Sequence, residues 1–257
     1  MARTLITGMG VVSAIGNNVA ENHQSLKGGK TGIKKPQFLD SKYAGIFSFG
    51  EVNLSNVQLF KELKLADSKG ITRTELLALK AYREAISQSG LTQHEISSVD
   101  TAFISGTTVG GMAETQHLHE DANTNAEPSE FVNSYRSGAH TQRIAKIHGM
   151  KGYTDTINTA CSSAANAIML GTRMIRNGRV KRAIVGGVDS LAKYTVNGFN
   201  SLQIFSDELM KPFDQNRKGL NLGEGAGYLV LESEELVKDK LVLGEVLGYG
   251  NANDAHH

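Results

Sequence analysis

The sequence predicts an α/β layered fold with a mixed or parallel sheet. Short β-rich runs alternate with helix-patterned segments along most of the chain, an arrangement that builds layers of helices on a sheet. The 257 residues are 40% hydrophobic and 21% charged, with 28 glycines and 3 prolines, so the composition is that of a globular protein. A chain of this length buries one sizeable core or two modest ones.

The clearest element of the first part is a helix over residues 74–89. Its leucines and other apolar residues fall on one face, and Gly90 follows at a typical stop position. The other elements expected before residue 100 are a strand over 3–7 that enters a glycine-rich turn, a helix over 19–26, and an irregular stretch over 30–68 with a short helix near 57–64.

The rest of the chain continues the alternation. A helix is expected over residues 162–176, closed by Asn177 and Gly178. Strands are expected over residues 101–107, 154–160, 182–187, 227–232 and 241–249. The elements are separated by polar, irregular residues over 117–135 and by a loop-rich stretch over 199–220.

Composition excludes several classes of function. The formal net charge of +1 gives no electrostatic reason to expect nucleic acid or an anionic membrane as the main partner. No run approaches about 18 uninterrupted apolar residues, and the start of the chain resembles a first strand and not a signal peptide. The single cysteine cannot form an internal disulfide, which predicts a cytoplasmic protein.

That cysteine, Cys161, stands where an expected strand meets an expected helix. At a helix N-terminus, the helix dipole favours a thiolate and the free backbone N–H groups stabilise a developing oxyanion. Small residues follow it over 162–165, so we expect the helix to be buried in the centre of the fold. The alternative is a buried, inert cysteine, which is the commoner state of a free thiol, and the local sequence leaves both open.

Other motifs favour neither a cofactor nor a metal. The N-terminal glycines, Gly8, Gly10 and Gly16, lack the spacing of a dinucleotide-binding fingerprint, which disfavours an oxidoreductase. The glycine-rich stretch 211–232 has no Gly-Lys-Ser/Thr and is not a phosphate-binding P-loop; it is alternatively a structural turn with an ion pair between Asp214 and Arg217. Histidines lie close to acidic residues at 117–121 and again at 254–257, but neither stretch has the spacing of metal ligands.

Six motifs together resemble the β-ketoacyl-[acyl-carrier-protein] synthases, the elongating condensing enzymes of the synthase II type. They are ITGMGVVSAIG, SGTTVGGM, NTACSSAANAI, AIVGGVDS, KPFDQNRKGLNLGEGAGYLVLE and GYGNANDAHH, in the family's order and spacing. The resemblance implies a thiolase-like layered fold. It implies that residues 1–240 are the N-terminal half with the nucleophilic cysteine, and residues 241–257 the first strand and gating loop of an otherwise missing second half.

The resemblance also implies a reaction and its partners. Cys161 is expected to take an acyl group from acyl carrier protein, and malonyl-carrier protein then to condense with it by decarboxylation, in fatty-acid or polyketide synthesis. Val109 matches the acyl-channel entrance, and Asp254 and His257 match a gating loop near the pantetheine entrance. The family forms dimers through the strand before the cysteine, so a homodimer or a partner chain covering the missing half is expected.

The chain departs from the family in one important respect. The family's two catalytic histidines lie in His-Gly-Thr and Gly-His-x-x-Gly-Ala-Ala-Gly motifs, and neither motif occurs in the 257 residues. We therefore expect the chain to be part of a longer synthase, or to need a partner chain, and on its own at most to acylate itself. The alternative is a non-catalytic partner subunit resembling a chain length factor, although such subunits usually lose the cysteine. Lys211 and Lys218 replace the family's usual arginine and aspartate and leave the subfamily open.

Overall fold

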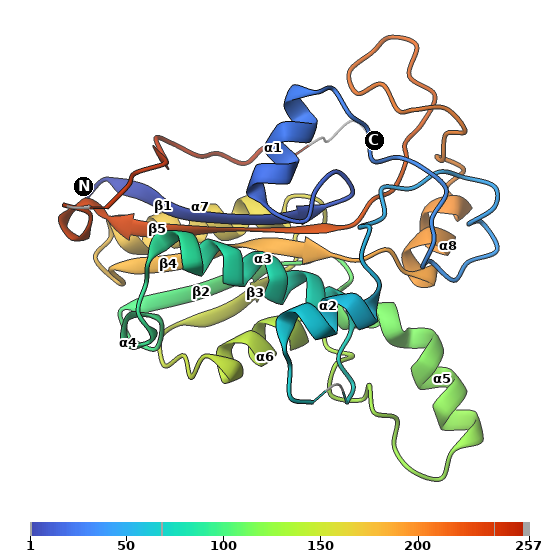
Figure 1. The fold of residues 1–257 in the computed structure, drawn as a ribbon, viewed down its shortest axis with the longest axis horizontal. Coiled ribbons are helices and arrows are strands. Elements are labelled where there is room, and N and C mark those ends of the chain that lie inside the picture. The colour runs from blue at the N-terminus through green and yellow to red at the C-terminus, as the bar shows by residue number, and fades with distance from the viewer. Residues whose placement is uncertain (1, 68, 239, 254–257) are drawn as a thin grey trace.

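The computed structural model describes residues 2–67, 69–238 and 240–253, and its centre is a six-stranded mixed sheet (Figure 1). The strand order is β3-β2-β4-β5-β1-β6. β2 is parallel to β3 and β4, whereas β5 is antiparallel to β4 and β1, and β6 is antiparallel to β1. The strands are β1 (Thr4–Ser13), β2 (Thr101–Gly106), β3 (Thr154–Ile157), β4 (Arg182–Asp189), β5 (Gly225–Ser233) and β6 (Gly244–Glu245).

Helices cover the two faces unequally, with α3 across the front of the sheet in Figure 1 and α7 behind it. None of the helices within the described residues is both long and apolar enough to cross a membrane. The α-helices are α1 (Val19–Lys27), α2 (Asn56–Leu63), α3 (Arg73–Ser89), α4 (Gln93–Ile96), α5 (Thr115–Thr124), α6 (Ala139–Ile147), α7 (Ser163–Arg176) and α8 (Lys193–Ser201). Two short 3₁₀ helices, η1 (Gly110–Glu114) and η2 (Glu234–Leu236), complete the set.

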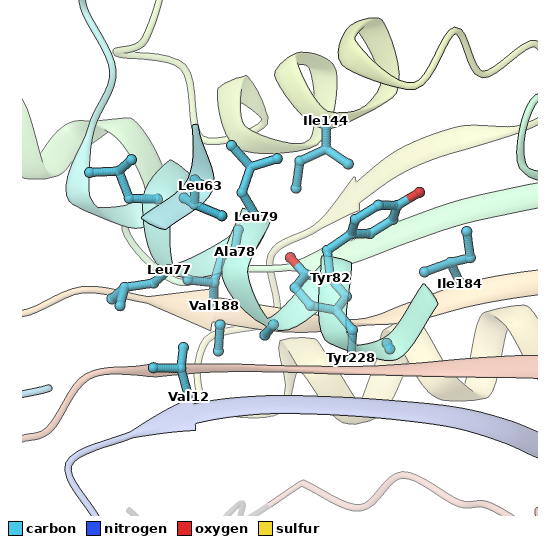
Figure 2. Packing of buried hydrophobic residues seen from close by; sticks show 14 of the residues in the cluster. Val12, Leu63, Leu77, Ala78, Leu79, Tyr82, Ile144, Ile184, Val188 and Tyr228 are labelled. Atoms are coloured by element: carbon cyan, nitrogen blue, oxygen red, sulfur yellow. The ribbon is translucent and has the colours of Figure 1, made fainter. Parts of the chain in front are cut away.

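The expected helix over 74–89 is α3, and local signals fix both of its ends. Thr72 and Glu75 form a reciprocal capping box at its start, and Gly90 ends it in the left-handed conformation with φ of 67°. Its apolar side chains enter the largest core cluster, where Tyr82 packs beside Tyr228 of β5 (Figure 2). A Cβ atom at Gly10 would overlap the backbone of this helix, so the glycines of β1 allow the close approach.

The opposite face of the sheet carries α7. Its inner side packs on a second cluster that includes Ile104, Val185 and Leu231, all buried. Its outer side is largely uncovered: Ala164 and Ala165 are exposed, and Ile168 is only partly buried. The expectation of a helix buried in the centre of the fold is therefore correct for the face of α7 that lies on the sheet. The other face is only partly covered by described residues, through contacts of Arg176 with Val246 and of Asn166 with Asn251.

Several other expectations about the elements need correction. Residues 117–135, expected to be irregular, contain most of α5, and the helices α4, α6 and α8 were not expected. α5 has no buried residue, so its sequence shows no apolar periodicity. The strand expected over 154–160 ends at Ile157, because the chain turns at Ala160. Of residues 241–249, only Gly244–Glu245 forms a strand, and it pairs with β1 in the same sheet.

Candidate active site

Cys161 lies in a cavity of about 370 Å³ at one end of the sheet. The ends of β1, β2, β4 and β5 and the start of α7 form its walls, so five segments far apart in sequence meet there. Cys161 is a free, exposed thiol. The structure therefore does not support the alternative of a buried, inert cysteine.

A strained turn places the thiol at the start of α7. Ala160, directly before Cys161, has φ of 52°, a left-handed conformation that is unusual for a residue with a Cβ atom. Ser163 holds the turn in place, because its Oγ donates to the Ala160 carbonyl at 2.6 Å and accepts from the Thr159 N–H at 2.9 Å. Such conformations persist only where surrounding contacts impose them, and they are frequent at functional sites.

Two glycines let the first turn of α7 sit directly on the sheet. A Cβ atom at Gly106 of β2 would overlap the backbone of Ser163, and one at Gly187 of β4 would lie 2.9 Å from the Cβ of Ala164. Neither position therefore leaves room for a side chain. Because these strands carry no side chain at the contact, the helix N-terminus reaches the cavity and brings Cys161 with it.

Val109 lies at the end of the loop that follows β2 and is 7% exposed. The preceding residues, Thr107 and Thr108, line the Cys161 cavity, whereas Val109 itself lies just outside that lining. The carboxylate of Asp189 holds this loop, because it accepts from the N–H groups of Thr108 and Val109 and from the Thr107 hydroxyl. The sequence had not singled out Asp189, although it lies within one of the six family motifs.

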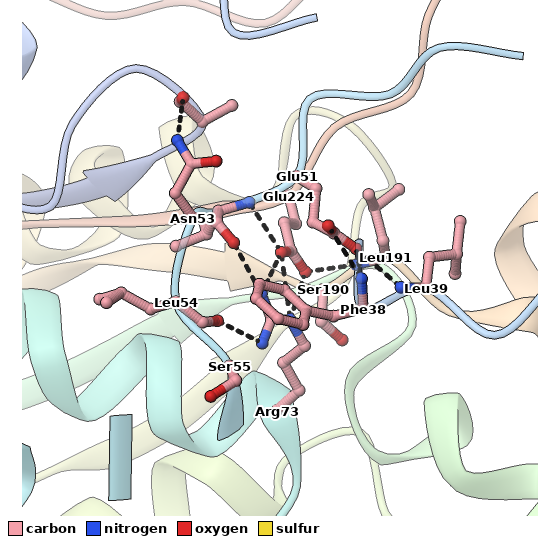
Figure 3. A network of polar contacts seen from close by, with 12 residues as sticks. Phe38, Leu39, Glu51, Asn53, Leu54, Ser55, Arg73, Ser190, Leu191 and Glu224 are labelled. Atoms are coloured by element: carbon pink, nitrogen blue, oxygen red, sulfur yellow. Dashed lines mark hydrogen bonds and ion pairs between the residues drawn. The ribbon is translucent and has the colours of Figure 1, made fainter. Parts of the chain in front are cut away.

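A buried ion pair supports the other side of the cavity. Glu224, which lines the cavity, has a fully buried side chain and pairs with Arg73 at the start of α3, with Oε1 2.5 Å from Nη2 (Figure 3). Its carboxylate also accepts from the backbone N–H groups of Val52 and Leu191 at 2.9 and 3.0 Å. One buried carboxylate thus ties three separate segments to the cavity wall, a role that the glycine-rich motif around it did not reveal.

A second buried polar group lies behind the strand that carries Gly106. His140 of α6 is fully buried, with Nε2 2.8 Å from the Ser105 Oγ and Nδ1 3.2 Å from the Ser137 carbonyl. Burial lowers the pKa of His140 to about 4, against a weaker opposing effect of the Ser137 carbonyl. The imidazole is therefore neutral at neutral pH, with Nδ1 as donor and Nε2 as acceptor.

Two of the expected site residues, Asp254 and His257, lie outside the described residues. The segment that leads toward them crosses α7: Arg176 donates to the Val246 carbonyl, and the Asn251 side chain donates to Asn166 Oδ1 at 2.8 Å. Asn166 lies only five residues after Cys161. The described end of this segment therefore lies close to the start of the helix that carries the thiol.

The remaining motifs were candidates for a metal site or an ion pair. No group of three or more histidine, cysteine or acidic residues there could hold a metal ion. His117 lies on an exposed face of α5 and stacks on Phe131. The ion pair expected between Asp214 and Arg217 is not among the described contacts; Arg217 instead donates to the backbone carbonyl of Asp214.

Comparison with known proteins supports the resemblance to the β-ketoacyl synthases. The sequence model of the β-ketoacyl synthase N-terminal domain matches residues 1–236. The chain is 28% identical to 3-oxoacyl-[acyl-carrier-protein] synthase 2 of Coxiella burnetii and 27% identical to that of Staphylococcus aureus, in each case over 99% of this chain and 64% of the relative. The chain thus spans about 64% of the length of these curated relatives.

Solved structures agree with the sequence matches. The ishigamide ketosynthase/chain length factor aligns with a TM-score of 0.90 and 29% identity, over 100% of this chain and 65% of that chain. A ketosynthase in complex with its chain length factor from Xenorhabdus doucetiae aligns with a TM-score of 0.73 and 26% identity, over 91% of this chain and 58% of that chain. The thiolase-like fold expected from the motifs is confirmed, and the chain belongs to the β-ketoacyl synthase family, whose N-terminal domain it contains.

Proposed function

We propose that Cys161 accepts an acyl group from a carrier-protein thioester, as the first step of a β-ketoacyl-[acyl-carrier-protein] synthase. The observation that carries this proposal is the exposed thiol at the N-terminus of α7, opening into a cavity of about 370 Å³ in a chain of this family. The enzyme class is an acyltransferase of fatty-acid or polyketide synthesis.

The chemistry suits the geometry. The Cys161 thiolate attacks the thioester carbonyl, and the tetrahedral oxyanion collapses to a new Cys161 thioester as the carrier's thiolate leaves. The Ser162 and Ser163 N–H groups already donate to the Thr159 and Ala160 carbonyls, at 3.3 and 3.0 Å. An oxyanion would therefore draw on the other N–H groups of the first turn of α7, which have no acceptor within the helix. In the second step, decarboxylation of malonyl-carrier protein yields a carbanion that attacks this thioester, releases Cys161 and leaves a β-ketoacyl chain two carbons longer.

The 257 residues contain neither of the family's two histidine motifs, so we propose that this chain alone stops at the acyl-Cys161 stage. Residues 1–240 then act as the half that carries the nucleophile, and 241–257 as the beginning of a second half. In this scheme Val109 borders the acyl channel, and Asp254 and His257 belong to the gate at the pantetheine entrance.

The proposed partners are acyl carrier protein and a second protein chain. The curated relatives are named for acyl carrier protein, which supports the first. The largely uncovered face of α7 and the position of β3 at the edge of the described sheet support the second, either a homodimer partner or a chain that supplies the other half. A single cysteine without a disulfide partner supports a cytoplasmic location.

The test is acylation of the purified chain. The protein is incubated with acetyl- and octanoyl-N-acetylcysteamine thioesters and with acyl-carrier protein, and its intact mass is followed over time. We expect one acyl adduct per chain, and none in the Cys161→Ala variant. If the wild-type chain takes no acyl group from any of these donors while its thiol still reacts with iodoacetamide, the proposal is wrong.

The second candidate is a non-catalytic partner subunit. The two structural relatives above are described together with chain length factors, which favours this reading, whereas an intact and exposed Cys161 disfavours it. A chain that binds a ketosynthase tightly but forms no acyl adduct would support the partner role.

A further inference from the structure

The backbone of Thr108 is held at both its N–H group and its carbonyl group. Its N–H donates to both carboxylate oxygens of Asp189 at 3.0 Å, and its carbonyl accepts from the Asn158 side-chain amide at 2.9 Å. Asp189 ends β4, Thr108 follows β2 and Asn158 follows β3. These are three adjacent strands in parallel orientation, so the two side chains join three neighbouring strand ends at the cavity.

The same two side chains hold the neighbours of Thr108 as well. Asp189 accepts from the Val109 N–H at 3.1 Å, so it holds the residue proposed to border the acyl channel. Asn158 Oδ1 accepts from the Ala160 N–H at 3.4 Å, so it also contacts the left-handed residue directly before Cys161. A continuous series of polar contacts therefore runs from the loop that carries Val109 to the turn that carries the thiol.

The two ends of this series differ in strength. Asp189 offers a charged acceptor to backbone N–H groups in a partly buried position, and hydrogen bonds to charged groups are about twice as strong as neutral ones. Asn158 is exposed, so water replaces its bonds easily and they contribute little to overall stability. Their effect is instead on orientation, because Asn158 touches the turn where Ala160 is already strained.

We propose that Asn158 is a positioning residue for Cys161, acting with Asp189 through Thr108 so that the Val109 loop and the Cys161 turn are held in one fixed relative position. This inference rests on the proposed function. An octanoyl group attached to Cys161 must extend past the Val109 loop, whereas an acetyl group ends near the thiol. A loosened link should therefore slow the longer donor more than the shorter one.

The test compares wild type with Asn158→Ala, Asp189→Asn and the double variant, using the 257-residue chain. Acylation of Cys161 by acetyl- and octanoyl-N-acetylcysteamine thioesters is followed by intact mass. Alkylation by iodoacetamide reports on thiol exposure, and thermal unfolding reports on the fold. Asn123→Ala is the matched control, because Asn123 is exposed and its described side-chain contacts are to His119 within α5.

We expect Asn158→Ala to slow acylation by the octanoyl donor about tenfold and by the acetyl donor about threefold, the larger effect corresponding to about 1.4 kcal/mol. Iodoacetamide alkylation should stay within about twofold of wild type, since exposure is unchanged. The double variant should be about as slow as Asp189→Asn alone, because both substitutions break one linkage. Asn123→Ala should match wild type.

A second measurement tests whether the Val109 loop and the Cys161 turn are coupled, and it needs no acyl donor. In hydrogen–deuterium exchange, Asn158→Ala should accelerate exchange over residues 107–110, and Asp189→Asn should accelerate exchange over 158–162, each at the far end of the series. Acylation rates equal to wild type in Asn158→Ala, rate effects that multiply in the double variant, or exchange changes confined to the mutated segment would each overturn the inference. A wild-type chain that takes no acyl group would instead refute the proposed function, while exchange would still test the link.

Discussion

Tyr82 of α3 and Tyr228 of β5 meet edge to face in the core, with ring centroids 6.3 Å apart, yet only one of the two hydroxyls is satisfied. The Tyr228 hydroxyl lies 2.6 Å from the Ser105 Oγ, within the cluster that includes His140. The Tyr82 hydroxyl is buried and has no hydrogen-bond partner among the described residues. The Tyr228 hydroxyl therefore contributes a hydrogen bond to the core, whereas the Tyr82 hydroxyl does not.

Tyr82→Phe should stabilise the protein, because it removes a buried hydroxyl that lost its bond to water on folding. We expect the free energy of unfolding to rise by about 1 kcal/mol, and Tyr228→Phe, which breaks a made hydrogen bond, to lower it by about the same amount. Urea denaturation followed by circular dichroism measures both. A loss of stability in Tyr82→Phe equal to that in Tyr228→Phe would show that the Tyr82 hydroxyl has a partner in solution.

The buried His140 should make stability depend on pH. Burial lowers its pKa to about 4, below the value near 6.5 of an unfolded chain, so between these values the unfolded state binds more protons. The contribution of His140 to the free energy of unfolding is therefore fully present above about pH 6.5. It falls as the pH drops toward 4, by up to ~1.4 kcal/mol per pH unit. Burial, followed by the nearby Arg83, also lowers the pKa of His148, which acts in the same direction.

The measurement is the free energy of unfolding between pH 7 and pH 5, a range above most carboxylate titration. His140→Gln should show a shallower decline than wild type, with a remaining slope from His148. Absolute stability is not the criterion, because this variant also changes the bond to Ser105. Parallel curves for wild type and His140→Gln would show that the imidazole takes up its proton in the folded state.

Gly106 should not tolerate even a methyl group. A Cβ atom there would overlap the backbone of Ser163, so Gly106→Ala should displace the start of α7 and lower the free energy of unfolding by about 1–3 kcal/mol. Gly198→Ala is the matched control, because Gly198 lies in α8 and, apart from its chain neighbours and the nearby backbone of its own helix, no described atom lies within 4 Å of the new Cβ. This control should gain about 0.5–1 kcal/mol from improved helix propensity, so the two substitutions should differ in sign.

The ion pair between Arg73 and Glu224 should be costly to break from one side. Glu224→Gln leaves the Arg73 guanidinium without its buried anion, and we expect a loss of about 3–5 kcal/mol in the free energy of unfolding. The exposed pair between Lys218 and Glu208 offers the comparison, and Glu208→Gln should change stability little. Similar effects of the two substitutions in urea titrations would contradict the assignment of Glu224 as a structural support of the cavity.

The sequence predicted those elements whose signals are local. α3 was placed within one residue, because its apolar stripe and Gly90 lie within the helix or directly beside it. β1 was expected to end at Thr7 but runs to Ser13, since Gly8 and Gly10 resemble a turn until α3 is packed against them. α5 could not be predicted, because a helix without buried residues has no periodic pattern to detect.

Local sequence likewise predicted some features of the candidate site and not others. The position of Cys161 at a strand-to-helix junction was readable from the sequence, whereas its exposure depends on what covers α7. Asp189 and Glu224 could not be assigned from local sequence, because the groups that they hold lie between 33 and 172 residues away along the chain. The roles of Val109, Asp254 and His257 stay predictions.

The position of β3 links association to chemistry. It is the outermost strand on one side of the described sheet, and the chain reaches Cys161 only four residues after it ends. A strand that pairs along this edge would bind beside the reactive turn. If pairing changes the affinity of the site for an acyl group, then acylation must change the strength of pairing by the same factor, because coupling between two binding equilibria is reciprocal. Acylation of the Cys161 sulfur would then be measurable as a change in the self-association of the protein.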